Sequence, residues 1–263
     1  MIPLDELFPA GDFRFHLTLR RGDPRDFFRP SDPTGAILAE RKRWLADTPT
    51  RYAALRPEDG PMLEEFAGLC AGWIGQSGNL PANPVGIGGA IEPDFLLLSP
   101  DADGRFRLRG GALCFPTGWA LEEKVGQTME FIHGVVPGLN VAIGAPIEQF
   151  LSRLKPGLAY LRDNWGIAAT DELNLHPARR LPPPALPVAL DRLWLRVEHQ
   201  ALVALPVTKG VVFGIRIALH RLDAVARDAT AAAGLKGALA SMAEEMAAYK
   251  RLDAVRAELI ARL

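Results

Sequence analysis

The chain has 263 residues, of which 48% are hydrophobic and 23% are charged, and its formal net charge is −1. This balance is typical of a globular protein whose core is large enough to enclose an apolar pocket. The small net charge excludes a global attraction to nucleic acid or to an anionic membrane. The sequence has no long uncharged apolar run and no signal-peptide pattern at its N-terminus, so we expect no membrane association and a cytoplasmic location.

The two cysteines, Cys70 and Cys114, lie far apart and form no Cys-x-x-Cys pattern. They are too few for a zinc site made of cysteines alone or for a four-cysteine iron–sulfur cluster within this chain. Without a secretion signal, we expect both thiols to be reduced and buried.

The first half of the chain predicts helices and then two strands. Helices are expected at "AILAERKRWLADTP", from Ala36 to a stop near Pro49, and at "PMLEEFAGLCAGWIG", whose apolar residues share one stripe. The segment "DFLLLSPDADGRFRLRGGALCFP" predicts two strands joined by a turn. Phe106 and Leu108 alternate with arginines there, which indicates one apolar face and one solvated face.

The second half predicts helices, a strand, a hairpin and a helical tail. Helices are expected in "WALEEKVGQTMEFIHGVVPG", which must end by Pro137, and in "GAPIEQFLSRLKPG". A strand is expected at "LAYLRDNWGIA", and a hairpin at "LWLRVEHQALVALP" and "GVVFGIRIALHRL". The Ala-rich tail from Asp223 to Leu263 predicts helices with a solvated charged face.

Two strands, a helical stretch and three strands follow one another in the order of a PAS-type sheet. The expected fold is therefore α+β, with a PAS-like antiparallel sheet of five strands under helices that cover a ligand pocket, and with extra helices at both termini. Other α+β folds fit the same order.

Polar residues gather in two of the predicted strands. Because side chains alternate along a strand, Arg196, Glu198 and Gln200 point to one face and His199 to the other. Such a row forms either an ion pair on an exposed face or a polar patch in an apolar pocket. His133, between apolar residues and a Val-Pro turn, is likewise either a core residue or a ligand-binding residue. The sequence has no P-loop, no HExxH and no histidine pair at metal spacing, although His199 and His220 could approach each other across the hairpin.

Several motifs occur in an order that resembles a known family. They are "CFPTGWALEEKVGQTMEFIHGVVPG", "YLRDNWGIA" and "LWLRVEHQALVALPVTKGVVFGIRI". Together they resemble the DUF3445 family, the haem-binding α-subunit of haem-dependent oxidative N-demethylase. The segments "FRFHLTLRRGDP", "ERKRWL" and "EPDFLLL" extend the resemblance over roughly residues 12–225. His199 stands where the family pattern has an arginine, and Val135 where it has a proline.

The resemblance implies haem b in a PAS-like core over residues 81–225, with a helical extension at 1–80 and a helical segment at 226–263. It favours an enzyme, a haem-dependent amine monooxygenase. This enzyme would oxidise a small secondary amine such as dimethylamine with O₂ to formaldehyde and a primary amine. Because the chain lacks a Rossmann motif and has two cysteines, NADPH electrons would come through a partner reductase subunit with FMN and 2Fe–2S. The alternatives are a haem PAS sensor of gas or redox state and a haem-free interaction subunit.

The same resemblance suggests the residues that hold the cofactor. His133 is the candidate iron ligand, since it can supply a neutral imidazole nitrogen, and His176 and His199 remain alternatives. Lys124 and Arg162 are candidates to bind the haem propionates, or else are simple surface charges.

A protonated amine requires a carboxylate, for which Glu198 is the first candidate and Asp163 the second. Arg196 is expected to fix Glu198 and keep it ionised, because a nearby cation favours the charged form. The pocket around them is expected to be shaped by three further residues: Asn164, Trp165 and Gln200.

Overall fold

The computed structural model describes residues 4–8, 12–13 and 19–263. His16 and part of the N-terminal segment that resembles the family lie outside these residues. The elements before the third strand are α1 Leu4–Leu7, β1 Arg20–Gly22, α2 Pro24–Phe28, α3 Ala36–Asp47, α4 Pro49–Tyr52, β2 Ala53–Leu55, the 3₁₀ turn η1 Pro57–Asp59, α5 Gly60–Trp73 and α6 Pro84–Gly88.

The remaining elements contain the long strands. They are β3 Asp94–Pro100, β4 Phe106–Ala112, α7 Met129–His133, the π-helical turn η2 Asn140–Gly144, α8 Ala145–Ser152, β5 Ala159–Ala168, the 3₁₀ turns η3 Pro177–Arg179 and η4 Leu190–Arg192, β6 Trp194–Ala204, β7 Val211–Arg221, α9 Leu222–Arg227, α10 Ala229–Ser241, α11 Glu244–Tyr249 and α12 Arg256–Arg262. Within the described ranges, no helix is long and apolar enough to cross a membrane.

The sheet is antiparallel, with the order β1-β5-β6-β7-β3-β4-β2. The predicted α+β class is therefore confirmed. The sheet has seven strands rather than the expected five. The two additional strands, β1 and β2, are three residues long and lie at the two edges. Neither is long enough to show the alternation by which the five inner strands were predicted.

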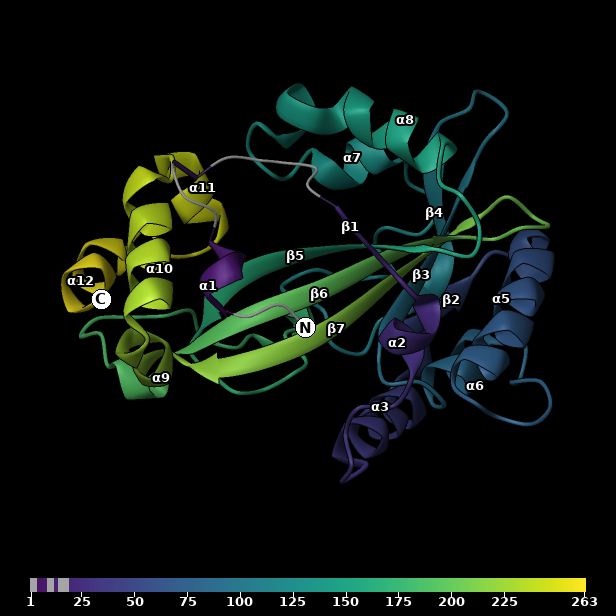
Figure 1. Ribbon diagram of the computed structural model, residues 1–263, viewed down its shortest axis with the longest axis horizontal. Coiled ribbons are helices and arrows are strands. Elements are labelled where there is room, and N and C mark those ends of the chain that lie inside the picture. The colour runs from purple at the N-terminus through teal and green to yellow at the C-terminus, as the bar shows by residue number, and fades with distance from the viewer. Residues whose placement is uncertain (1–3, 9–11, 14–18) are drawn as a thin grey trace.

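Helices cover both faces of the sheet (Figure 1). The face to which Ala201 and Gly214 point, here called the α2/α5 face, carries an aromatic core that includes Phe27, Phe28 and Phe66. Gly214 permits the close approach of α2, because a Cβ at this position would lie 2.6 Å from the Phe27 ring. The opposite face, here called the α7/α8 face, lies beneath α7 and α8.

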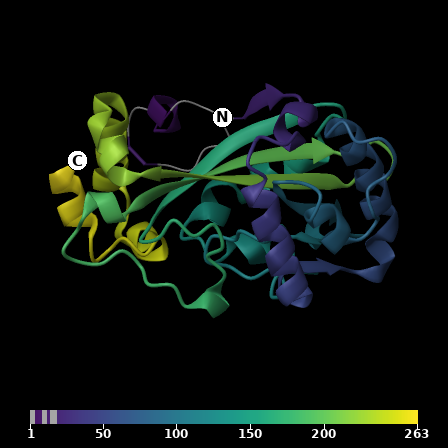
Figure 2. The same ribbon diagram turned by 90° about the horizontal axis from the view of Figure 1, so that it is seen from below.

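The C-terminal helices gather at one end of the long strands, and the N-terminal helices α2, α3, α5 and α6 gather at the other (Figures 1 and 2). A separate core joins these C-terminal helices to the sheet, with Leu195, Val197 and Ile167 from the strands and Leu235 and Leu259 from the helices. The tail is thus helical as predicted, but it is divided into four helices, α9 to α12.

The helix expected after Gly118 is confined to α7. The preceding residues instead pair with β4, where Leu108 and Gly126 donate to the carbonyls of Gln127 and Leu108. Gly126 has φ +86°, which is incompatible with a continuous helix. The helix begins only at Met129, where the Thr128 side chain caps it.

A buried ion pair connects α3 to the first residue of β3. Arg41 donates to Asp94 at 2.5 Å, and both side chains are fully buried. Asp94 also accepts from the backbone N–H groups of Cys114 and Phe115, at 2.6 and 3.0 Å. One carboxylate therefore fixes an N-terminal helix and the segment that follows β4. Both cysteines are free and buried, as predicted.

Replacing Asp94 with Asn is expected to lower the free energy of unfolding by about 3–5 kcal/mol, because Arg41 would keep a buried charge without its partner. Urea denaturation measures the change. The matched control is Asp26→Asn on the exposed side of α2, where the loss of the ion pair with Arg29 should cost no more than about 0.5 kcal/mol. Equal stability of the two variants would contradict the anchoring role of Asp94.

Candidate functional site

The pairing of β5 with β6 divides the predicted polar residues between the two faces of the sheet. Arg162 lies opposite Gln200 and Asn164 lies opposite Glu198, all on the α7/α8 face. Asp163 and His199 also lie opposite each other, but their side chains point to the α2/α5 face. The fold thus brings Arg162, Asn164, Glu198 and Gln200 together and separates them from Asp163.

Glu198 is the centre of this cluster. Its carboxylate accepts hydrogen bonds from the Thr117 hydroxyl at 2.5 Å, the Gln200 amide at 2.8 Å and the Asn164 amide at 3.2 Å. The residue is only 9% exposed. Three donors that carry no charge therefore hold a nearly buried carboxylate in one orientation.

Arg196 reaches Glu198 through Thr117 rather than by a direct ion pair. Its Nε donates to the Thr117 hydroxyl at 2.9 Å, and this hydroxyl donates in turn to Glu198. Its Nη2 donates to the carbonyls of Phe115 and Leu173, at 2.9 and 2.8 Å. Burial lowers the pKa of Arg196 to about 10, so the residue remains a cation at neutral pH.

Thr117 is a site residue that the sequence patterns did not indicate. The available signal was its place in the "FPTGW" motif, but no local pattern could reveal that this motif lies against β6.

His133 ends α7 on the same side of the sheet, where its charge would interact with that of Arg162. Burial, followed by the repulsion of Arg162, lowers the pKa of His133 to about 4. The pKa of Arg162 is also lowered by burial, against the opposing attraction of Glu198 and Asp163. Neither the His133 nor the Arg162 side chain forms a hydrogen bond or an ion pair with any residue that the structure describes. A neutral imidazole and an unpaired guanidinium thus lie on facing elements.

The other histidines considered as ligands have protein partners. The Nδ1 atom of His199 lies 2.5 Å from the Asp163 carboxylate, whereas its buried Nε2 has no partner among the described residues. His176 accepts from the Ala178 N–H through Nδ1, and its Nε2 lies 3.2 Å from Glu122. Both ring nitrogens of His176 have partners, and His199 points to the α2/α5 face, so His133 is the better placed to bind a metal ion on the α7/α8 face.

Two predicted site residues lie apart from the cluster. The Lys124 ammonium lies 5.3 Å from the centre of the Phe131 ring, with which it forms a cation–π contact. Trp165 points to the opposite face from Asn164, and its ring packs edge-on against Phe8 at 5.3 Å. Trp165 thus belongs to the core under the C-terminal helices.

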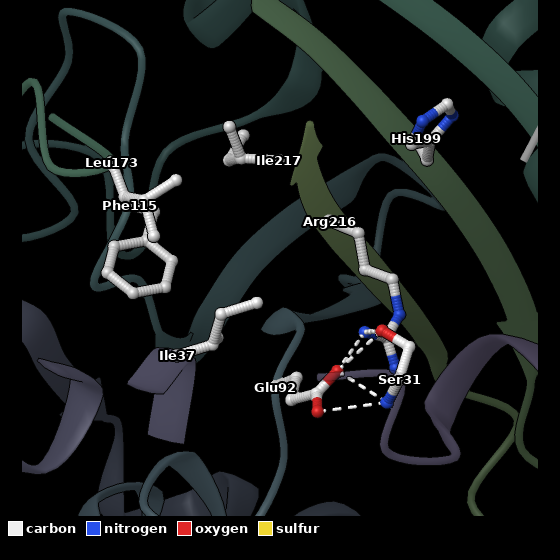
Figure 3. Close-up of a pocket in the computed structure, with 8 residues that line it drawn as sticks. All are labelled: Ser31, Ile37, Glu92, Phe115, Leu173, His199, Arg216 and Ile217. Atoms are coloured by element: carbon white, nitrogen blue, oxygen red, sulfur yellow. Dashed lines mark hydrogen bonds and ion pairs between the residues drawn. The ribbon is translucent and has the colours of Figure 1, made fainter. Parts of the chain in front are cut away.

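A small cavity of about 50 Å³ lies beside β7 (Figure 3). Arg216 binds Glu92 and Ser31 on one side of it, and four apolar residues line it: Ile37, Phe115, Leu173 and Ile217. This volume can hold about a water molecule or two, far less than a ligand pocket of a few hundred Å³ requires. The cavity is therefore not the candidate site.

A model of the family described as haem-dependent oxidative N-demethylase, alpha subunit-like (HODM_asu-like), matches residues 81–260. The chain belongs to this family. The family description indicates dependence on haem and an alpha subunit that works with partner components. The match includes β3 to β7, α7 and the C-terminal helices up to α12.

The residues on the α7/α8 face have the donor chemistry that haem requires. Haem iron takes a neutral imidazole, and the low pKa of His133 keeps this ring unprotonated at neutral pH. Haem propionates take a guanidinium, and Arg162 has unused N–H donors. A His133–Arg162 pair without protein partners therefore fits the group that the family description names.

In the haem-free protein, the His133 imidazole is expected to titrate near pH 4, and NMR of its ring protons measures this. An unfolded histidine has a pKa of 6.5, so between these two pH values the unfolded chain binds more protons. The contribution of His133 to stability should consequently fall as the pH drops through this window. His133→Gln should flatten this part of the stability profile. A midpoint above pH 6 would contradict the described environment.

Proposed function

We propose that the chain is the haem-binding subunit of an oxidative N-demethylase. In this proposal, haem b lies against the α7/α8 face and a small secondary amine such as dimethylamine binds at Glu198. The amine is oxidised with O₂ and two electrons from NADPH, giving formaldehyde, a primary amine and water. The electrons come from a reductase partner with FMN and 2Fe–2S, since this chain has neither a dinucleotide motif nor the four cysteines of an all-cysteine cluster.

The observation that carries the proposal is the pairing of His133 with Arg162 beside the polar cluster of Glu198. Both side chains are half-buried, and neither has a hydrogen-bonding partner among the described residues, so their nitrogen atoms remain available to a ligand. Here both groups lie on the same side of the sheet, and each matches a different part of one ligand. A PAS-like core is supported by the order of the five long strands, two before and three after the helices α7 and α8.

His133 would hold the iron and Arg162 a propionate, while bound haem would supply the oxygen and one-electron chemistry. Glu198 would bind the ammonium group of the substrate. An ionised carboxylate has about four acceptor positions, and Thr117, Asn164 and Gln200 occupy three. The remaining position can accept an N–H of a small ammonium ion, and the three fixed donors prevent the carboxylate from turning away.

The haem proposal predicts a Soret band after reconstitution of the purified full chain. His133→Ala should weaken haem binding at least about tenfold and change the ligand-field bands, because it removes the bond to iron. His220→Ala, on the other face of the sheet, is the matched control and should keep the wild-type spectrum. A wild-type chain that yields no Soret band would refute the haem proposal. An unchanged spectrum in His133→Ala would refute only the ligand assignment.

Glu198→Gln is expected to raise the KM for a secondary amine about tenfold or more, because the neutral amide loses the charge-assisted hydrogen bond to the ammonium. Steady-state turnover with the reductase components measures this KM. Glu123→Gln, an exposed glutamate outside the cluster, should keep the wild-type KM. If Glu198→Gln and Glu123→Gln behave alike, the amine does not bind at Glu198. Haem binding without any turnover of amines would instead favour a sensor.

A further inference from the structure

The end of α11 is held rigidly beside β5. Arg251 has φ +58°, and the N–H groups of Arg251 and Leu252 donate to the carbonyls of Ala248 and Ala247, at 2.9 and 2.8 Å. This is the Schellman arrangement of a helix end. Leu252 and Ala247 are buried in the C-terminal core. Lys250, between them, therefore has a fixed backbone position.

The Lys250 side chain reaches from α11 to the strand that carries Asn164. Its ammonium donates to the Trp165 carbonyl at 2.6 Å and lies 5.1 Å from the centre of the Trp165 ring. Trp165 directly follows Asn164, which donates to Glu198. An ammonium has three N–H donors, and within the described residues Lys250 uses one of them in a hydrogen bond. This lysine was expected on a solvated helix face, and the structure places it against the sheet.

Glu198 is the carboxylate with which the Lys250 charge interacts. The phenol of Tyr249, on the same helix end, also interacts with Glu198. Two further cations whose charges interact with that of Glu198 are Arg162 on β5 and Arg196 on β6. Glu198 is therefore approached by cations from both strands and from the C-terminal helices.

We propose that Lys250 controls how tightly Glu198 binds a cationic amine, by competing electrostatically with the ammonium group of the substrate. This role of Lys250 rests on the proposed binding of an amine at Glu198. Lys250 would thus be a specificity-determining residue on the C-terminal helices, and its side chain would not have to touch the substrate. A positive charge held beside a carboxylate weakens the attraction of a second cation to that carboxylate.

This competition depends on pH. Burial lowers the pKa of Lys250 to about 8, against the opposing attraction of Glu198. An exposed aliphatic ammonium has a pKa of about 10.4, so a secondary amine in solution stays protonated well above pH 8. The arginines keep their charge in the same range. Between pH 7 and 9 the competing charge of Lys250 is therefore lost while the substrate remains a cation, and amine binding should strengthen.

The test is calorimetric titration of the haem-reconstituted full chain with dimethylammonium chloride at pH 7, 8 and 9. The dissociation constant of the wild-type protein is expected to fall about three- to tenfold from pH 7 to 9. Lys250→Met should bind as tightly at pH 7 as the wild type does at pH 9, with no further change. Lys250→Arg, which stays charged, should bind weakly throughout. Lys236→Met, at an exposed position on α10, should follow the wild type.

The outcomes separate the two proposals. If the wild type and Lys250→Met show the same pH dependence, the role of Lys250 is refuted and the amine site stands. If the wild type binds no amine, or if Glu198→Gln binds it equally well, the amine site is refuted together with the role of Lys250. Thermal melting shows whether Lys250→Met is folded. If it is not, Lys250→Arg tests the role of Lys250 instead, because amine binding by this permanently charged variant must not change between pH 7 and 9.

Discussion

The candidate site depends on the buried carboxylate of Asp94. This residue binds Arg41 of α3 and the backbone N–H groups of Cys114 and Phe115. The same short segment continues to Thr117, whose hydroxyl joins Arg196 to Glu198. The orientation of Glu198 is therefore set by a helix that precedes the residues matched by the family model. The N-terminal helices thus support the site, although they contribute no residue to the cluster around Glu198.

The alternation of side chains along β5 and β6 explains why two neighbouring carboxylates have different roles. Asp163 points to the α2/α5 face, where it binds Arg20 and His199 at 2.6 and 2.5 Å. Burial would raise the pKa of Asp163, but these two hydrogen bonds outweigh it and hold the pKa below its usual range. The carboxylate of Asp163 is thus already bound by Arg20, a cation, and by His199, which can become one. The hydrogen-bond donors to Glu198 carry no charge, and the cations near it form no direct ion pair with it, so it can still bind a cationic ligand directly.

The sequence was sufficient for features that depend on local periodicity. The five long strands, the helices α3, α5 and α8, and the shared face of Arg196, Glu198 and Gln200 follow from patterns of two or about four residues. The edge strands β1 and β2 were missed because three residues carry no period. Thr117 and Lys250 were missed because their partners lie far away in the sequence. Only the tertiary fold shows that a loop and a C-terminal helix meet the same two strands.

Arg162 and Arg196 show why the absence of a partner is informative here. Both are arginines on adjacent strands, both point to the α7/α8 face, and burial lowers the pKa of each. Arg196 satisfies its guanidinium with Thr117 and backbone carbonyls, as a structural arginine does. Arg162 has no such partners among the described residues, although folding has removed it from much of the solvent. The N–H donors of half-buried Arg162 therefore remain available to an anion, and an anion that binds only the folded chain would stabilise the fold. This difference distinguishes Arg196, a residue of the scaffold, from Arg162, a candidate residue of the binding site.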